Sequence, residues 1–484
     1  NTGPSGALPA GRTQLGVDLG DDHPVSMGIP AGKSDLAAPP AGDAVQLDRN
    51  GLVQCTSCHS PHDPEFTPFL VKDPVSGLRG GALCLSCHRP QEWERGAHAI
   101  ATTAAVPPAL ALKDPPESVS ELACRACHRV HSADERARLG RGTLPARCTD
   151  CHDGTVGPDV AGQFLQTSRH PAGTGNHDPA EDLRSLPQAK RHAECPDCHN
   201  PHATRPSTDE VGPNAPESLY GIGGVSAQYI GGRWAEPATV PARMISHEYQ
   251  LCFKCHSEWG YGLQPPVSPS RSQSDGLSAP EQTSPAAAFN PANNGLHAVV
   301  GPHHRRGTAA PGAFRGSDRA GMPWGWDSVL LCTDCHGANV DSPGPRGPHG
   351  SSEPFVLRAA WAHPAKSGLV TEPLTGTAGT RGHLCFLCHD PAIYLDGFGT
   401  STGFRTASGL NLHGGTYHQA GCTACHSGVP HGFTNRAMLV EASDPYPYNA
   451  GARVTYPDDA FGPVLPPSGD WEKADCQTDC HQGL

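Results

Sequence analysis

The residues best suited to chemistry in this chain are ten short motifs, each ending in a histidine that directly follows a second cysteine. Nine motifs read Cys-x-x-Cys-His, and the last has three residues between its cysteines. In chain order, numbered 1 to 10, they are Cys55/Cys58-His59, Cys84/Cys87-His88, Cys124/Cys127-His128, Cys148/Cys151-His152, Cys195/Cys198-His199, Cys252/Cys255-His256, Cys332/Cys335-His336, Cys385/Cys388-His389, Cys422/Cys425-His426 and Cys476/Cys480-His481. Because they use all 20 cysteines, one chemistry should explain every cysteine.

That chemistry is covalent haem attachment. Two thiols of such a motif add to the two vinyl groups of haem, and the adjacent imidazole binds the iron as its proximal ligand. A zinc protein would show Cys and Cys/His pairs without a histidine behind every second cysteine, and disulfides need no histidine. We therefore predict ten covalently attached haem c groups. The longer spacing of Cys476 and Cys480 leaves a terminal disulfide as the alternative at that motif.

The sixth iron ligands should be histidines as well. The chain has 28 histidines, so 28 − 10 = 18 remain after the proximal ligands are assigned, against four methionines in unrelated contexts. Histidine on both faces of the iron gives a lower reduction potential than a methionine ligand does. We therefore expect low-potential electron transfer sites.

Recurring sequence contexts select the candidate distal ligands. One group follows a proximal histidine by three residues, as in "CHSPH", and should leave its own haem to bind a neighbouring one. A second group precedes a proline, which fixes the adjacent backbone, and a third lies in Pro-His-Gly. The predicted ligands are His62, His131 and His202 of the first group, His23, His170 and His363 of the second, His349 and His431 of the third, and His98, His297 and His413. For any single one, a surface or hydrogen-bonded histidine is the alternative.

The composition predicts an unusual fold. Apolar residues make up 36% of the chain, while it holds 57 Gly and 50 Pro, which is close to the composition of disordered proteins. About 48 residues accompany each motif, so the haems themselves must form the core. We predict mostly irregular coil with short helices wrapped around a chain of ten c-type haems, and few or no strands. The motifs and residues 132–140 are the expected helices.

Spacing between motifs suggests a domain organisation. We predict an N-terminal arm at 1–50, a six-haem region at 51–260 and a four-haem region with the C-terminal haem site at 297–484. Residues 261–296 between them are rich in Pro and Ser and form either a flexible linker or an ordered surface wrap. The wrap is favoured because His297 must return to an iron.

Charge and hydropathy exclude some classes of function. The net charge is −13, so no basic field is available for nucleic acid, and partners should present basic patches. No stretch has the 18 or so apolar residues that a membrane-crossing helix needs. The chain starts at Asn1 without a charged-then-apolar pattern, so we expect that a targeting peptide was removed and that the protein matured outside the cytoplasm.

The doubled motifs resemble a known family. The pattern in "RHAECPDCHNPH" (Arg191 to His202) and in "LCTDCHGAN" followed by "GPHG" is similar to outer-surface and periplasmic multihaem c-type cytochromes of metal-reducing bacteria. This resemblance implies electron transfer through stacked haems with two histidine ligands each, and acceptors such as metal oxides. Some members polymerise into extracellular filaments, the cytochrome nanowires, in which a histidine of one subunit ligates a haem of the next.

We therefore expect a conductor of electrons rather than an enzyme, and no catalytic residue is predicted. The favoured form is a filament subunit outside the cell or on its surface, joined head to tail, in which either the arm with His23 or the C-terminal haem completes a site in a neighbour. The alternative is a discrete cytochrome of the periplasm or of an outer-membrane complex, with other cytochromes as redox partners. A multihaem reductase would need an open iron face, whereas all ten motifs end in histidine.

Overall fold

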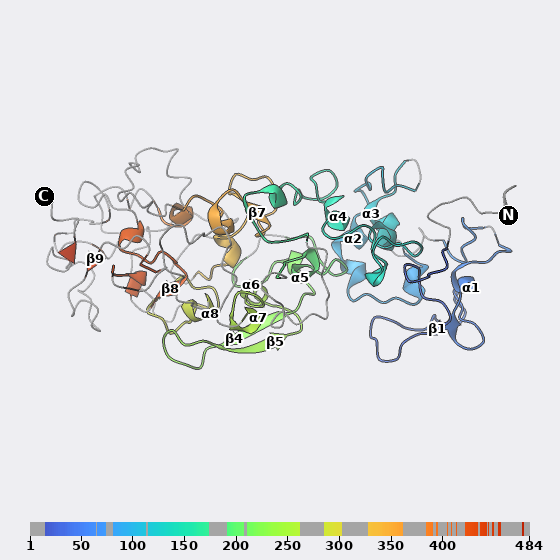
Figure 1. The fold of residues 1–484 in the computed structure, drawn as a ribbon, viewed down its shortest axis with the longest axis horizontal. Coiled ribbons are helices and arrows are strands. Elements are labelled where there is room, and N and C mark those ends of the chain that lie inside the picture. Colours follow the sequence, from blue (N-terminus) through green and yellow to red (C-terminus); the bar gives the residue numbers. More distant parts are fainter. Residues whose placement is uncertain are drawn as a thin grey trace.

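The chain is an elongated body that follows its own sequence from one end to the other. In the computed structural model, the described residues are 15–63, 65–73, 81–112, 115–173, 191–207, 211–261, 285–302, 328–361, 384–390, 422–433 and 436–442, with isolated positions at 394, 404, 408, 413, 444, 448–449, 454–455 and 477–478. The first motifs lie in the blue part at one end of Figure 1 and the last described motif lies in the red part towards the other. Motifs that are neighbours in sequence are therefore neighbours along the body.

Helices in the described ranges are short, and many of them are the motifs themselves. The α-helices are α1 Cys55–Cys58, α2 Ala97–Ile100, α3 Val119–Leu122, α4 Ala146–Thr149, α5 Cys195–Cys198, α6 Glu248–Cys252, α7 Glu258–Tyr261 and α8 Pro285–Ala288. Single 3-10 turns are η1 Cys84–Ser86, η2 Trp93–Arg95, η3 Ala123–Ala126, η4 Ala137–Leu139, η5 Gln163–Leu165, η8 Glu217–Leu219, η10 Cys332–Asp334, η11 Pro354–Val356, η12 Leu384–Leu387, η13 Cys422–Ala424 and η14 Arg436–Met438. One turn is enough to present two cysteines and a histidine together.

The strands form five antiparallel pairs within the described part of the chain. They are β1 Met27–Gly28 with β2 Leu52–Val53, β3 Ser168–Arg169 with β7 Gly350–Ser351, β4 Gly224–Gln228 with β5 Ala238–Ala242, β6 Gly295–Leu296 with β8 Gly432–Phe433, and β9 Val454–Thr455 with β10 Gln477–Thr478. Two of these pairs, β3 with β7 and β6 with β8, join segments that are far apart in sequence. The small sheets therefore act as ties between distant parts of the chain.

The predicted fold class is confirmed, with one local correction. Residues 132–140 do not form the predicted helix, because only Ala137–Leu139 makes a turn and Arg138 has a φ of 59° inside it. The backbone reverses there so that the Arg138 carbonyl can accept a hydrogen bond from His128 Nδ1 at 2.8 Å. The domain boundaries remain predictions, and most of the predicted linker, 262–284, lies outside the described residues.

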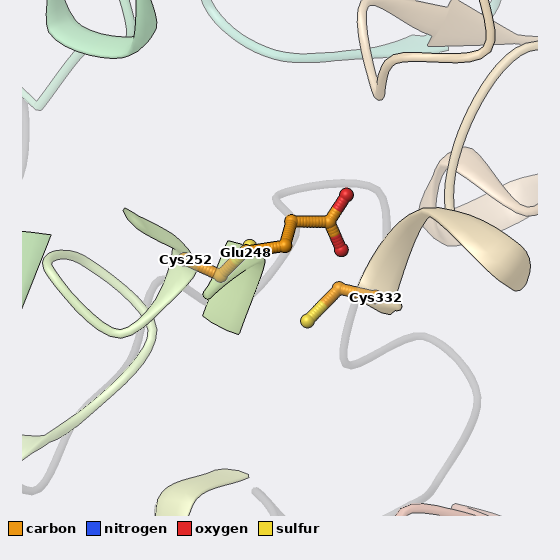
Figure 2. A group of neighbouring side chains, drawn as sticks. All are labelled: Glu248, Cys252 and Cys332. Atoms are coloured by element: carbon orange, nitrogen blue, oxygen red, sulfur yellow. The ribbon is translucent and has the colours of Figure 1, made fainter. Parts of the chain in front are cut away.

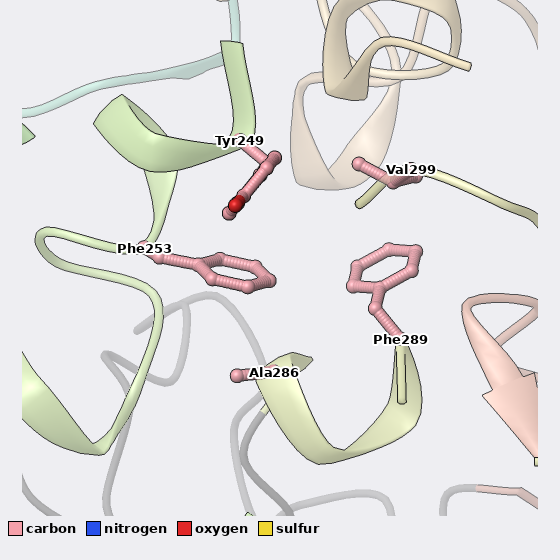
Figure 3. Packing of buried hydrophobic residues seen from close by; sticks show 5 residues of the cluster. All are labelled: Tyr249, Phe253, Ala286, Phe289 and Val299. Atoms are coloured by element: carbon pink, nitrogen blue, oxygen red, sulfur yellow. The ribbon is translucent and has the colours of Figure 1, made fainter. Parts of the chain in front are cut away.

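Apolar side chains pack in several small clusters instead of one core. The largest, shown in Figure 3, contains Tyr249, Phe253, Ala286, Phe289 and Val299. Phe253 lies between the two cysteines of motif 6, and three of the other clusters also include a motif cysteine. The apolar residues thus pack around the motifs, as expected if a bulky cofactor completes each cluster.

None of the helices in the described ranges is both long enough and apolar enough to cross a membrane.

Candidate haem sites

Nine proximal histidines each face one other histidine ring. The centroids of the facing rings are 5.9 to 6.4 Å apart. In motif order the pairs, proximal residue first, are His59–His131, His88–His23, His128–His202, His152–His98, His199–His349, His256–His170, His336–His431, His389–His297 and His426–His413.

This separation fits one iron atom between two imidazoles. A metal–imidazole bond of about 2 Å on each face, plus about 1.2 Å from nitrogen to ring centre on each side, places the centroids about 6.4 Å apart. Rings in van der Waals stacking would lie closer, and no hydrogen bond spans such a gap. The pairs therefore have the spacing of two axial ligands on a shared metal.

Hydrogen bonds orient the proximal rings for this role. At the odd-numbered motifs Nδ1 of the proximal histidine lies 2.8 to 3.1 Å from a backbone carbonyl oxygen. The acceptors are Pro68, Arg138, Ser218, Phe355 and Ala437 for His59, His128, His199, His336 and His426. Because a carbonyl can only accept, Nδ1 must carry the proton, and the Nε2 lone pair is left for a metal.

A repeated loop supplies most of these carbonyls. After motifs 1, 3, 7 and 9 the chain reverses and pairs back on the proximal histidine, for example His59 with Leu70 and His426 with Leu439. The residue at the reversal has a positive φ in each loop, such as Phe69 at 58° and Ala437 at 54°. A carbonyl aimed back at the imidazole requires this sparsely populated backbone conformation. Four motifs therefore share one local scaffold.

The distal histidines are tied together two by two. In each of four cases, the carbonyl just before one distal histidine accepts a hydrogen bond from a second distal histidine, an arrangement that we call a crossed pair. The four crossed pairs are His23 with His131, His98 with His202, His170 with His349 and His297 with His431. The accepting carbonyls belong to Val130, Pro201, Pro348 and Pro430.

Two of the small sheets hold crossed pairs in place. β3 ends directly before His170 and β7 begins directly after His349, so pairing Arg169 with Gly350 brings the two histidines together. β6 and β8 do the same for His297 and His431. A ladder of two residues thus fixes where two imidazoles from distant segments meet.

Each crossed pair serves two successive motifs. The member of the pair that comes first in the sequence faces the proximal histidine of an even motif. The member that comes second faces the proximal histidine of the odd motif just before that even motif. His98 and His202, for example, face His152 of motif 4 and His128 of motif 3. The second member lies in sequence just after an odd motif, and it faces the previous odd motif. His202, for example, follows motif 5 and faces motif 3. Consecutive motifs are therefore interlocked along the whole described body.

Burial keeps these imidazoles uncharged, the form in which they can bind a metal. Burial, and to a smaller extent the neighbouring His199, lowers the pKa of His349 to about 3. Burial, followed by His336, lowers the pKa of His431 to about 3, and burial with His128 lowers the pKa of His202 to about 4. Desolvation penalises the imidazolium and so favours the neutral ring.

The sulfur atoms show how the motifs follow one another. The first cysteines of motifs 2 and 3, 4 and 5, 6 and 7, and 8 and 9 lie within hydrogen-bonding reach of each other. Between motifs 3 and 4, and between motifs 5 and 6, the second cysteines are neighbours instead: Cys127 is near Cys151, and Cys198 is near Cys255. Motifs 1 to 9 therefore form a single row in sequence order.

The second cysteines of motifs 8 and 9, Cys388 and Cys425, each lie in the turn of their own motif. The N–H of Cys388 donates to the Cys385 carbonyl at 3.3 Å, and the N–H of Cys425 donates to the Cys422 carbonyl at 3.3 Å. All cysteines of motifs 1 to 9, including these two, are outside any disulfide. The turn agrees with the predicted motif, while the attachment of haem to Cys388 and Cys425 themselves stays a prediction.

One group of side chains resembles a separate metal site but belongs to this row. Glu248, Cys252 and Cys332 place three ligand-type atoms within 4.8 Å of one another (Figure 2). Both sulfurs belong to motifs 6 and 7, where thioether formation removes the thiolate that a metal would need. The Glu248 carboxylate accepts from the Thr333 hydroxyl at 2.6 Å and from its N–H at 3.2 Å. Glu248 thus ties motif 6 to motif 7.

The surroundings of the ring pairs suit a cofactor with acidic substituents. Nε1 of Trp93 and Nη2 of Arg125 are buried and have no hydrogen-bond acceptor among the described residues. The ring centroids of Trp93 and His202 lie 6.2 Å apart, beside motif 3. Because unpaired buried donors are rare in proteins, the propionates of a haem are fitting acceptors here.

The structure does not bring every predicted ligand to an iron site. His62 is exposed, and no described imidazole faces it. His363, Cys476, Cys480 and His481 lie outside the described residues. Sequence reasoning missed the acceptors that orient the distal ligands, including Asp22 at 3.2 Å from His131 Nδ1 and Gln163 at 2.9 Å from His349 Nδ1. Neither residue stands in a context that would have marked it.

The comparisons with known proteins agree with this geometry. A family model for the doubled CXXCH motif matches residues 49–92 and 117–157, which contain motifs 1 to 4. Motifs 1 to 4 thus match the doubled motif through which multihaem c-type cytochromes bind haem covalently.

Its relationship to a curated protein is distant. Multiheme cytochrome MtrA of Shewanella baltica (strain OS185) is 24% identical over 235 residues. The match covers 43% of this chain and 57% of the relative, so the chain spans little more than half of that relative's length. No solved structure matches.

Proposed function

We propose that the chain is a molecular wire of ten haem c sites, arranged in sequence order, with each iron bound by two histidines. The observation that carries this proposal is the row of nine facing imidazole pairs at the spacing of axial ligands. Haem iron takes up or releases one electron by changing between its ferric and ferrous states. The protein's own contribution is to fix the two imidazoles and the two sulfurs at each site and to keep successive sites adjacent.

The count of ten includes motif 10. Cys476, Cys480 and His481 would hold that haem. Intact mass measurement of the mature protein should give ten haems per chain, and Cys480→Ser should lose no haem other than the tenth. Nine haems in the wild-type protein, with Cys476 and Cys480 joined by a disulfide, would contradict the tenth site.

We further propose that the wire works outside the cytoplasm, on the cell surface or beyond it, as a subunit of a filament. The elongated shape supports this proposal, since motif 1 and motif 9 lie towards opposite ends of the body (Figure 1). A head-to-tail contact between such ends does not close on itself and gives a fibre. Its partners would be further copies of the chain, other cytochromes, and acceptors such as metal oxides. The alternative is a discrete cytochrome of the periplasm or of an outer-membrane complex.

Electron microscopy of the natively expressed protein distinguishes the two forms. We expect filaments whose axial repeat equals the length of one chain. Discrete particles at every protein and salt concentration would contradict the filament and favour the discrete carrier. A carbon monoxide difference spectrum tests the wire itself, since haems with two histidine ligands should not bind the gas, and a stoichiometric binding fraction would contradict the proposal.

A further inference from the structure

The two members of a crossed pair obtain their hydrogen-bond acceptors in different ways. In three of the pairs, Nδ1 of the first member donates to a backbone carbonyl, as His170 does to Pro348 at 2.6 Å. That carbonyl directly precedes the second member, so the second member must find its own acceptor elsewhere in the fold. Because second members face odd motifs, the odd motifs are the sites at which the distal surroundings can differ.

Motifs 1 and 5 differ in this respect. At motif 1, the Asp22 carboxylate lies 3.2 Å from Nδ1 of the distal His131. At motif 5, the Gln163 amide oxygen lies 2.9 Å from Nδ1 of the distal His349. The proximal histidines of both motifs face a backbone carbonyl oxygen, at 3.1 Å and 3.0 Å. The proximal sides therefore match, while one distal acceptor is charged and the other is neutral.

The orientation of the Gln163 amide is fixed by the fold. Gln163 is 4% exposed, and its Nε2 donates to the Pro345 carbonyl at 2.9 Å. Since that carbonyl can only accept, Oε1 must face His349 and Nδ1 of His349 must carry the proton. A Cβ at Gly344 would collide with Nε2, so the loop that carries His349 leaves room for the amide. The Phe164 ring covers His349 at 5.7 Å between centroids, and this neighbour is uncharged as well.

We propose that Gln163 is a positioning residue for His349 and that, as a neutral acceptor, it keeps the iron of motif 5 easier to reduce than the iron of motif 1. Electron transfer along the row is then favourable from motif 1 to motif 5. One electron leaves the iron of motif 1, which becomes ferric, and the ferric iron of motif 5 becomes ferrous. This inference rests on the proposed electron wire and gives that wire a direction.

Two physical effects act in the same direction. An ionised carboxylate that accepts from a ligating imidazole makes the ligand more basic, and it favours the ferric state by about tenfold more than a neutral acceptor does. Water also stabilises the additional positive charge of ferric iron. Cys55 of motif 1 is exposed, whereas Cys195 and Cys198 of motif 5 are only partly exposed. Both effects lower the potential at motif 1 relative to motif 5.

The test is a spectroelectrochemical titration of the whole holoprotein with two variants, Asp22→Asn and Gln163→Leu. Each difference from the wild-type curve should account for one electron per chain and should mark the potential of one site. We expect the Asp22→Asn difference at the lower potential, separated from the other by about tenfold in the one-electron equilibrium, which is about 59 mV. Gln163→Leu should make its own site about two- to tenfold easier to reduce, because His349 loses its acceptor.

Gln166→Leu is the matched control for Gln163→Leu. It makes the same change directly after the same turn, at a residue that accepts from Arg169 through its backbone carbonyl. Its titration curve should superimpose on that of the wild type. A shift as large as that of Gln163→Leu would assign the effect to the turn and overturn the role of the amide.

Haem content and carbon monoxide binding separate this inference from the wire on which it rests. Gln163→Leu protein with wild-type haem content and an unchanged titration curve would overturn the role of Gln163. Differences in the reverse order would overturn the direction and leave the wire intact. If Gln163→Leu does not assemble, Asp22→Asn decides alone, because its difference should lie in the lower-potential half of the wild-type curve, and a place in the upper half would overturn the direction. Stoichiometric carbon monoxide binding by the wild type would overturn both proposals.

Discussion

Replacing Asp22 with asparagine should raise the reduction potential of the haem held by motif 1. The carboxylate is buried, with the residue 6% exposed, and its Oδ1 lies 3.2 Å from His131 Nδ1 and 3.1 Å from Ser132 N. His131 faces the proximal His59. A carboxylate that accepts from the far nitrogen of a ligating imidazole makes that ligand more basic and favours the ferric state.

The size of the shift follows from the hydrogen bond that is weakened. A hydrogen bond to a charged group contributes about 1.5–3 kcal/mol and a neutral one about 0.5–1.5 kcal/mol, so Asp22→Asn removes about 1–1.5 kcal/mol. If this difference falls on the ferric state, which carries the extra positive charge, the potential rises by about 40–60 mV, at 59 mV per tenfold change in the one-electron equilibrium.

Spectroelectrochemical titration of the whole protein measures this change. The difference between the variant and wild-type curves should account for one electron per chain and should lie at the potential of a single site. Asp18→Asn is the matched control, because it removes the same charge from the same arm, where Asp18 is exposed and pairs with Arg136 at 2.6 Å. Superimposable titration curves, or an equal shift in the control, would refute the reasoning.

Three further predictions concern the ligands and the packing. His349→Met should raise the potential of one haem near the middle of the row, and an unchanged titration curve would mean that His349 is no ligand. Acid should destabilise the fold, because His349 and His431 have a pKa of about 3 when folded, against about 6.5 when unfolded. The unfolded chain therefore binds protons first, and the free energy of unfolding should fall as the pH drops from 6.5 towards 3, whereas equal denaturation midpoints at pH 7 and pH 5 would count against this. Phe253→Ala should lower the free energy of unfolding by about 3–5 kcal/mol, since this side chain is 1% exposed, while Phe69→Ala at the surface should change it far less.

The sequence predicts the components of the sites better than their assembly. The spacing of cysteines and histidines identifies the attachment motifs because covalent chemistry acts within a few residues. Local contexts also select distal candidates, and the structure places nine of them, among them His23 and His349, opposite proximal rings. His23 faces His88 of its own chain, and the completion of a site in a neighbouring copy by the arm stays a prediction.

Which ring meets which could not be predicted, because distant segments decide it. His170 reaches its place through the two-residue pairing of β3 with β7, and neither strand has a sequence pattern that would identify it. The failed helix at 132–140 has the same cause. Its residues favour a helix locally, but the carbonyl of Arg138 is needed by His128, and this contact determines the backbone.

The interlocked crossed pairs limit how such a protein can grow. Removing or duplicating two consecutive motifs, together with the segments between them, leaves every imidazole opposite an iron. Removing one motif changes odd sites into even ones. One histidine would then have no iron to bind, and one iron would have no distal ligand. Gene duplication should therefore lengthen a wire of this design in steps of two haems.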